Sequence, residues 1–375
     1  MVSRSMKKIK VGHSRSGYIM IFTLLVIAAS MVIVAYVGRR GSVHAPFMHM
    51  AIAREKAKLL ALSGIQIAVA QLAKVPEKEN QKESAGKSSD KGKASSGEDK
   101  ESQQFLQRIL PSLNRWQTFE LVEQTDGIDA TIELCLMCEE GKINLNRMYN
   151  FKKDIFRGDK EKGWKVILQE LCKSIEKTTK MTDLFPVFEK IFKERRTKFN
   201  DATELITKKE FQPFKDLLFY EPPSLVISEK KEKKQQQIYL TDIFTVWTSS
   251  GKIEPWLFSH SINVIFGLEQ AVNTNDMKKR KEQVDGWVKN FKQKSQWEQD
   301  WKTILQPMYG KELRTLPKNI DSMLSTIFDP HFFSVRVHAK VGEVTQRVYA
   351  ILERTKSSQG SDIEYDVTMK KLYWL

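Results

Sequence analysis

The chain has 375 residues and a net charge of +15 at pH 7, and 41% of its residues are apolar. This length allows two or three compact units with a hydrophobic core, and three cysteines are too few for a scaffold built on disulfides. Because lysines are spread over most of the chain, the charge favours a solvated basic surface over a dedicated nucleic-acid site.

Residues 18–37 form a run of twenty residues in which only Thr23 and Ser30 are polar. As a helix, this run would be about 30 Å long, which is the thickness of the hydrocarbon core of a bilayer. The apolar region of a secretory signal peptide is typically shorter, about 7–15 residues. We therefore predict a helix that spans a membrane. Basic residues flank both of its ends, so they only weakly favour a cytoplasmic N-terminus.

The apolar pattern continues at helical spacing beyond this run. The expected apolar stripe consists of Ile52, Leu59, Leu60, Leu62, Ile65 and Val69. Gly38, Gly41 and Pro46 predict a bend or an interruption between the two parts. The expected element is one long N-terminal helix, half in lipid and half packed on a soluble body.

Residues 76–102 contain no aromatic and no branched aliphatic residue, and they mix both signs of charge. Such a segment cannot bury enough apolar surface to offset its loss of conformational entropy. We therefore predict a disordered linker, with order returning at Phe105.

Two segments with strand-like alternation flank Thr125-Asp126-Gly127, a pattern typical of a β-hairpin. Cys135 and Cys138 lie in the second segment, where alternation would point them to opposite faces. We interpret them as core residues rather than as a zinc or redox pair, because a zinc site of this type needs four ligands. Their state, like that of Cys172, is left open.

Helical periodicity dominates from about residue 150 to residue 328. The segments expected to be helical are 163–178, 182–196, 201–211, 259–272 and 285–308. Residues 225–240 are expected to form an exposed charged loop. The residues of the segment 332–341 then alternate between apolar and polar, which predicts an antiparallel sheet with one solvent-exposed face. Because strands come from both sides of the helical block, we interpret that block as an insertion with its own core.

Motifs of enzymes are absent from this sequence: it has no GxSxG, no phosphate-binding loop of the Walker type, no HExxH and no GxGxxG. We therefore predict no enzymatic activity. The basic and aromatic stretch 278–302 has the composition of a surface for single-stranded nucleic acid. However, Trp297 and Trp301 lie four residues apart, on one helix face, so we interpret the aromatic residues as core and the lysines as solvated.

The opening stretch resembles a class III prepilin signal, because a short basic leader ends at Gly17 and the apolar helix begins at Tyr18. The segment 139–148, EEGKINLNRM, resembles the acidic-Gly-basic-Ile-Asn-Leu-Asn segment of K-type minor pseudopilins, the general secretion pathway protein K family. Segments 199–206, 239–256 and 332–354 resemble further parts of that family, in the same order. One departure is Glu254, which stands with a following proline where the family has an Ile-Asn-x-Asn segment.

The resemblance implies a pilin-like α+β fold: a long N-terminal transmembrane helix packed on an antiparallel β-sheet, with a large all-α insertion. It implies cleavage between Gly17 and Tyr18, and it assigns a structural role to the motif residues Glu139, Glu140, Gly141, Asn144 and Asn146. The family is described as binding calcium, but no metal ligands are identified in this sequence, so calcium is expected from the resemblance alone.

Phe22 stands at the fifth position of the mature helix, where most pilin-like subunits have glutamate. In those relatives the glutamate pairs with the terminal ammonium of the neighbouring subunit above. An unpaired carboxylate in hydrocarbon is unfavourable by at least about 2.5–3.5 kcal/mol. K-type pseudopilins similarly lack this glutamate, which fits a subunit at the tip of the filament with nothing above it.

The resemblance thus predicts a minor pseudopilin at the tip of the type II secretion pseudopilus, in the bacterial inner membrane, with a cytoplasmic N-terminus and most of the chain in the periplasm. The expected partners are other minor pseudopilins, the major pseudopilin filament, the prepilin peptidase and the membrane, without nucleic acid. The alternatives are a minor pilin of a type IV pilus or competence system, and a signal-anchored membrane protein with a ligand-binding helical domain. The expected domains are a leader (1–17), the transmembrane helix (18–75), a linker (76–102), a first β part (103–149), the helical domain (150–330) and a second β part (331–375).

Overall fold

The computed structural model describes residues 15–73, 97–158, 163–179, 183–222, 237–268, 276–317, 320–357 and 364–375. Residues 1–14 of the predicted leader, residues 76–96 of the predicted linker and residues 225–236 of the predicted charged loop lie outside the described residues. The chain divides into two compact units, residues 1–56 and residues 57–375.

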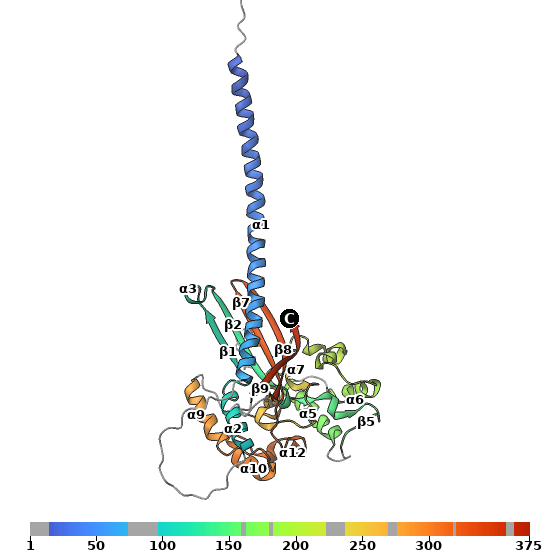
Figure 1. Ribbon diagram of the computed structural model, residues 1–375. Helices are drawn as coiled ribbons and strands as arrows, with labels where there is room; N and C mark the ends of the chain where they lie inside the picture. The colour runs from blue at the N-terminus through green and yellow to red at the C-terminus, as the bar shows by residue number, and fades with distance from the viewer. Residues whose placement is uncertain are drawn as a thin grey trace, which may run out of the picture. The chain divides into compact units, whose positions relative to one another are not determined.

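Helix α1 (Arg15–Ala73) is 59 residues long and contains the predicted membrane span (Figure 1). It stays helical through Gly38, Gly41 and Pro46, so the interruption predicted there is wrong. A proline removes one backbone hydrogen bond, and a glycine lowers helix stability by about 1 kcal/mol. The long helical stretches on either side outweigh these local effects, because helix propagation is cooperative.

The part of α1 that belongs to the second unit packs on a β-sheet through mostly small side chains. A Cβ on Gly64 would lie 2.5 Å from Cγ1 of Val337 and 3.3 Å from Cγ2 of Ile132, so glycine allows a very close approach. The buried residues recur along one face of the helix: Ala57, Ala61, Gly64, Ile65, Ala68 and Leu72. Of the stripe predicted from the sequence, only Ile65 is buried, because the backbone lies too near the strands for larger side chains.

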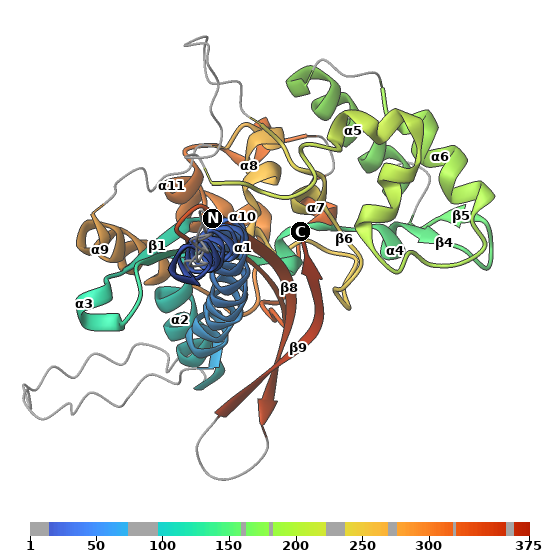
Figure 2. The ribbon, with the colours of Figure 1, turned by 90° about the horizontal axis from the view of Figure 1, so that it is seen from above.

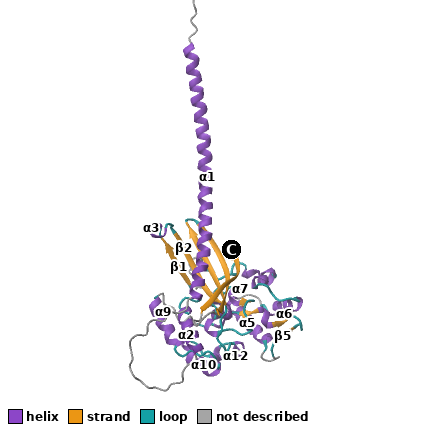
Figure 3. Cartoon of the chain, viewed as in Figure 1, coloured by secondary structure: helices purple, strands orange, loops and turns teal. Residues whose placement is uncertain are grey.

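The sheet has five strands in the order β1-β2-β7-β8-β9, and every neighbouring pair is antiparallel. Its strands are β1 (Trp116–Leu121), β2 (Ala130–Cys138), β7 (Phe332–Val341), β8 (Val344–Ser357) and β9 (Glu364–Trp374). The predicted hairpin joins β1 to β2 through the short helix α3 (Glu123–Asp126) and Gly127, whose φ of 72° lies in the left-handed region. The fold is therefore α+β and pilin-like, as predicted. Its main strands lie together beside α1 (Figure 3), and they come from before and after the helical segment (Figure 1).

One face of the sheet packs on α1, and the opposite face is also buried. Ser334, Arg336 and His338, which the alternation of β7 assigns to a solvent-exposed face, are at most 2% exposed. The segment 217–221, from the predicted helical insertion, packs on this face and places Phe219 beside Tyr349, with ring centroids 4.9 Å apart. The predicted solvent-exposed face is therefore wrong over the middle of β7, because a distant segment covers it.

Between β2 and β7 the described chain is mostly helical, with short strands. Helix α2 (Gly97–Ile109) precedes β1, and the α-helices between β2 and β7 are α4 (Leu145–Met148), α5 (Trp164–Thr179), α6 (Phe185–Glu194), α7 (Leu240–Ile243), α8 (His260–Phe266), α9 (Met277–Val288), α10 (Trp297–Ile304), α11 (Gln306–Tyr309) and α12 (Ile320–Met323). The 3₁₀ helices are Glu139–Gly141, Ala202–Thr207, Lys209–Phe214, Pro255–Leu257 and Leu313–Thr315. The short strands are β3 (Ile143–Asn144), β4 (Tyr149–Asn150), β5 (Ile155–Phe156) and β6 (Phe244–Thr245).

In the second unit α5 contacts α6 and α8, and α9 contacts α2. Figure 2 shows the pair α5 and α6 on the opposite side of this unit from α9. The buried apolar side chains of the helices and those of the α1-facing side of the sheet form one continuous cluster. The prediction that the helical segment has a separate core is therefore wrong.

Three predicted elements have different boundaries in the structure. Residues 97–102, predicted to be disordered, belong to α2, where Asp99 accepts a hydrogen bond from the backbone of Gln293 at 3.1 Å. The predicted helix 201–211 is a pair of 3₁₀ helices. The predicted helix 285–308 is broken because the backbone N–H of Ser295 bonds to the carbonyl of Thr326 at 2.8 Å. In the first and third cases a tertiary contact overrides the local pattern.

Candidate functional site

The first candidate site is the N-terminal part of α1, where residues Phe22–Arg39 are long and apolar enough to cross a membrane. The side chains of this span are exposed in the structure. The hydroxyl of Thr23 donates to the carbonyl of Met20 at 2.9 Å, and that of Ser30 donates to the carbonyl of Val26 at 2.7 Å. Both hydroxyl donors are thus satisfied within the helix, as a lipid-exposed helix requires. The span fits a single membrane anchor.

The predicted processing site also lies in α1. Gly17 and Tyr18 are helical in the structure, and nothing is described of their side chains. Phe22 is 61% exposed and begins the apolar span.

The outer face of α1 in the second unit is unusually apolar for an exposed surface. Leu59 is 66% exposed, and Leu62, Ile67 and Val69 are only partly buried. Leu59 lies away from the alanines and the glycine that contact the sheet, whereas Leu62, Ile67 and Val69 flank the buried face and pack against the edge of the core. The helix therefore buries mostly small residues on the sheet and leaves Leu59 exposed, with partly buried aliphatic side chains beside it, and this face can pack against another helix.

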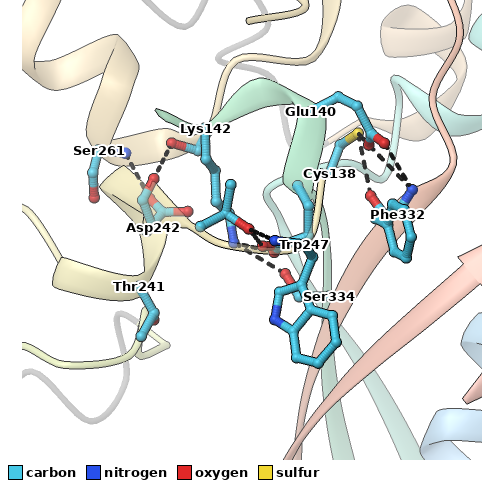
Figure 4. A network of polar contacts seen from close by, with 12 residues as sticks. Cys138, Glu140, Lys142, Thr241, Asp242, Trp247, Ser261, Phe332 and Ser334 are labelled. Carbon is cyan, nitrogen blue, oxygen red and sulfur yellow. Dashed lines mark hydrogen bonds and ion pairs between the residues drawn. The ribbon is translucent and has the colours of Figure 1, made fainter. Parts of the chain in front are cut away.

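The second candidate site is a buried polar junction where β2 leaves the sheet and enters the helical segment (Figure 4). It begins with the motif residues 139–146, which are all buried. A Cβ on Gly141 would lie 1.7 Å from the carbonyl oxygen of Leu257, so a side chain cannot be accommodated there. The glycine of the motif therefore allows two backbone segments to touch, one before and one after β6.

Glu139 and Lys142 form a buried ion pair, with 2.5 Å between Oε1 and Nζ. Lys142 also donates to Oγ of Ser334 in β7 at 3.1 Å, and Thr245 in β6 donates to Oε2 of Glu139 at 2.5 Å. Burial disfavours the charged ammonium, but the adjacent Glu139 carboxylate outweighs it and raises the pKa of Lys142. The pair therefore links the motif to the sheet and to β6.

Glu140 connects the motif to the start of β7. Its carboxyl oxygens accept hydrogen bonds from the backbone N–H of His331 at 3.0 Å, from that of Phe332 at 3.0 Å and from Sγ of Cys138 at 3.2 Å. Burial raises the pKa of Glu140 to about 7, although these donors oppose the shift. The side chain of Glu140 is thus a buried acceptor that holds both ends of the sheet connection.

Asn144 and Asn146 hold the chain beyond the sheet. Asn144 donates to the carbonyl and to Oγ1 of Thr248, both at 2.8 Å, and its Oδ1 caps α4 by accepting from the N–H of Asn146 at 2.9 Å. Asn146 bonds to both backbone groups of Phe199, at 2.7 and 2.8 Å. The structure therefore brings all five predicted motif residues, Glu139, Glu140, Gly141, Asn144 and Asn146, into one polar network of buried contacts.

A second Gly-Lys-Ile turn, residues 251–253, lies close to the first. Strand β3 after the first turn pairs in parallel with β6, and the N–H of Glu254 bonds to the carbonyl of Glu140 at 2.7 Å. Glu254 caps its 3₁₀ helix as Asn144 caps α4. Burial, and to a lesser extent the nearby Glu140, raises the pKa of Glu254.

Several residues of the junction were missed by the sequence analysis. Asp242 accepts from the backbone N–H of Ser261 at 2.6 Å, its carbonyl accepts from the hydroxyl of Ser259, and Thr241 donates to the carbonyl of Leu218 at 2.7 Å. The sequence points to this region through the family resemblance of the segment 239–256 and through the repeated Gly-Lys-Ile. It does not identify Asp242, because the partners of Asp242 come from the next helix.

The opposite face of the sheet carries another buried charge pair, between Arg336 of β7 and Glu221. The guanidinium of Arg336 also lies 4.9 Å from the ring centroid of Phe219. Nε2 of His338 lies 3.3 Å from Oε2 of Glu221, but burial lowers the pKa of His338 to about 3, so the imidazole is neutral. This pair fastens the segment 217–221 to the sheet.

The junction does not fit a calcium ion. Both carboxylate oxygens of Glu139 are engaged by Lys142 and Thr245, and those of Glu140 by backbone and thiol donors. A hard cation needs several free oxygen ligands, and the ammonium of Lys142 already provides the positive charge here. Within the ranges that the structure describes, no group of three or more His, Cys, Asp or Glu side chains is placed to hold a metal.

Cys135, Cys138 and Cys172 are buried and unbonded to one another, and burial raises the pKa of each thiol. Cys135 and Cys138 lie on opposite faces of β2, as predicted. Trp297 and Trp301 are also buried, at 5% and 1% exposure, which confirms their interpretation as core residues.

No protein-family model matches this chain, and no curated protein matches it significantly. Among solved structures, it is similar to a chain in the crystal structure of the GspK-GspI-GspJ complex from the type 2 secretion system of enterotoxigenic Escherichia coli. The similarity covers 89% of this chain and 99% of that chain, with 12% sequence identity and a TM-score of 0.39. A similarity at this level does not assign a function by itself.

Proposed function

We propose that this protein is a minor pseudopilin of a type II secretion system that takes part in assembly of the pseudopilus and in protein export. The observation that carries the proposal is the division of α1 into an exposed apolar span and a stretch that packs small residues on a β-sheet. A membrane anchor alone needs no second stretch of this kind. A subunit that leaves the membrane and packs its helix among others needs both.

The proposed assembly begins with cleavage between Gly17 and Tyr18 by a prepilin peptidase. The mature helix then holds the subunit in the inner membrane, with its N-terminus on the cytoplasmic side and the rest of the chain in the periplasm. Leu59 and the partly buried aliphatic residues beside it supply the surface for other pseudopilins. Burial of one such side chain is worth about 1.5–3 kcal/mol, so a few of them suffice for a specific helix contact.

The identity of residue 22 supports a position at the tip of the filament. Phe22 carries no charge, so the helix has nothing to pair with the terminal ammonium of a subunit above it. A carboxylate at this depth would be unfavourable unless such a partner were present. The proposed partners are therefore other minor pseudopilins in a tip complex, together with the major pseudopilin filament below it.

The proposed role of the polar junction is mechanical. Glu139, Lys142 and Glu140 tie the helical segment to β7, and Asn146 ties it to Phe199. We propose that the helical domain (150–330) caps the tip as a rigid part of the sheet-bearing unit, rather than as a flexible appendage.

The decisive experiment is to express the full chain with and without a prepilin peptidase and to sequence the N-terminus of the membrane-bound product. A new N-terminus at Tyr18 that depends on the peptidase, and is lost in Gly17→Leu, supports the proposal. Phe22→Leu is the matched control and should be cleaved normally. An intact Met1 in all samples would favour a signal-anchored membrane protein, and a cut beyond Val37 would indicate a signal peptide.

A second measurement separates the proposed pseudopilin from the minor pilin of a type IV pilus or competence system. The processed protein is co-expressed with minor pseudopilins and, separately, with minor pilins, and each membrane extract is analysed for complexes. Preferential recovery with the pseudopilins, weakened by Leu59→Glu, is expected. Preferential recovery with the pilins would instead assign the protein to a type IV pilus or competence system.

A further inference from the structure

A groove with a volume of about 520 Å³ lies beside the polar junction. It is formed by α4, the loop after β6, Lys198, the start of β7 and the C-terminal part of β8. The residues that matter for its chemistry are Asn144, Asn146, Arg147, Lys198, Trp247 and Phe332. The groove therefore combines two asparagines of the motif with two cations and two aromatic side chains, and its further lining residue His331 is paired with Asp329 at 3.0 Å.

The charge of this groove is positive. Arg147 and Lys198 form no ion pair within the parts of the chain that the structure describes. The carboxylate of the lining residue Glu353 is engaged by Lys370, with 2.5 Å between Oε2 and Nζ. The two cations of the groove are thus available to an external anion, while its carboxylate is not.

Asn146 holds both of these cations in place. It precedes Arg147 in α4, whose first turn is capped by Asn144, and it bonds to both backbone groups of Phe199, the residue after Lys198. A methyl group added to Gly251 would lie 3.1 Å from Cβ of Arg147, so the base of that side chain is closely packed as well. The backbone under each cation is therefore fixed before any ligand arrives, which lowers the entropy lost on binding.

The aromatic wall limits the kind of anion that fits. Trp247 is partly buried, and its backbone N–H donates to Oγ1 of Thr245 at 3.2 Å, which fixes its position. Phe332 is held by Glu140 at the start of β7. A small inorganic ion would contact the cations and leave these rings unused, whereas a polypeptide has carboxylates and apolar side chains close together.

We propose that this groove binds an acidic segment of a partner protein, with carboxylates on Arg147 and Lys198 and an apolar or aromatic side chain against Trp247 and Phe332. The guanidinium of Arg147 suits a carboxylate because its planar fork offers two parallel donors. The inference does not depend on the proposed role in secretion, since it requires only a partner with an exposed acidic segment.

The test uses the full chain in nanodiscs of zwitterionic lipid, so that anionic lipid does not compete. The probe is a fluorescein-labelled dodecapeptide in which glutamate alternates with tyrosine and glycine, and the reference probe has glutamine in place of each glutamate. Fluorescence anisotropy is expected to show binding of the acidic peptide at least about tenfold tighter than that of the reference. Equal binding of the two peptides would overturn the proposal.

Variants then locate the site. Arg147→Ala and Lys198→Ala should each weaken binding of the acidic peptide several-fold, and the exposed position of Lys198 makes its variant the one least expected to disturb folding. Lys340→Ala is the matched control, because it removes one exposed positive charge from the far end of β7. If all three variants weaken binding equally, the affinity of the peptide depends only on the net charge of the protein, and the proposal is wrong.

A charge reversal provides a gain of function that a folding defect cannot imitate. Arg147→Glu with Lys198→Glu should lose the acidic peptide and should acquire affinity for a peptide with lysine in place of each glutamate. Unchanged preference for the acidic peptide in this double variant would place its binding elsewhere.

Discussion

One face of the five-stranded sheet packs on α1 through alanine, glycine and aliphatic side chains, whereas the opposite face is covered by the segment 217–221 with the help of an ion pair. The first contact places Gly64 against Val337, and the second places Glu221 against Arg336. Both faces exclude water, but they depend on different physics. The apolar face depends on how closely two surfaces fit, and the polar face depends on each buried charge keeping its partner.

The junction at the end of β2 combines both requirements, because Gly141 needs close fit and its neighbours need partners. We predict the largest effect for Gly141→Ala. The new Cβ would lie 1.7 Å from a backbone carbonyl, which cannot move without displacing the turn around Leu257. Thermal or denaturant unfolding should show a loss of at least about 4 kcal/mol, or no folded protein. A stable variant would mean that the two turns do not touch.

The polar face can be broken from one side. Arg336→Met leaves the Glu221 carboxylate without its partner, and we expect unfolding to be easier by about 3–5 kcal/mol. The double variant Arg336→Met with Glu221→Leu removes both charges and should recover most of that stability, since neither charge is left alone. A double variant as unstable as the single one would show that shape, not charge, holds this face.

The stability of the junction should depend on pH through Glu140. Its pKa is about 7 in the folded protein and about 4.5 when unfolded, so the folded state binds the proton more tightly. Stability is therefore lost as the pH rises from about 4.5 to 7, by about 2 kcal/mol between pH 5 and 7. Glu140→Gln should flatten this part of the curve. An unchanged slope in denaturant unfolding across these pH values would contradict the assignment.

The pH dependence due to His331 has the same sign, although here the charged form of the side chain is the stabilised one. Its hydrogen bond to Asp329 raises its pKa to about 9, so it contributes stability below pH 6.5 that is lost as the pH rises towards 9. His331→Gln should remove this loss, which occurs mostly above the range in which Glu140 titrates. The two variants therefore act on separate parts of one stability curve.

The smallest expected effect concerns the apolar face. Gly64→Ala gains about 1 kcal/mol of helix propensity but forces the side chain of Val337 to move, and we expect a net loss of about 1–2 kcal/mol. Gly38→Ala is the matched control in the same helix, since its new methyl meets no neighbouring atom within 4 Å. If both variants are equally stable or more stable, α1 does not lie as close to the sheet as Gly64 indicates.

Elements with strong periodicity could be predicted from the order of the residues. Residues 18–37 had the length and composition of a membrane span, and the alternation in β2 placed Cys135 and Cys138 on opposite faces. The local pattern also predicted an antiparallel sheet with strands from before and after the helical segment, and it predicted the burial of Trp297 and Trp301. These features depend on which side chains are apolar and how they are spaced, and both are properties of the chain.

What covers each surface could not be predicted in this way, because it depends on contacts between distant segments. The alternation of β7 marked Arg336 and His338 as polar, but it did not show that Glu221, more than a hundred residues away, would bury them. The pattern in α1 pointed to its large aliphatic residues, whereas the close approach at Gly64 selected the small ones for the interior. Whether a side chain is buried depends on which distant segment packs against it. The periodicity of the sequence shows only whether that side chain is apolar or polar.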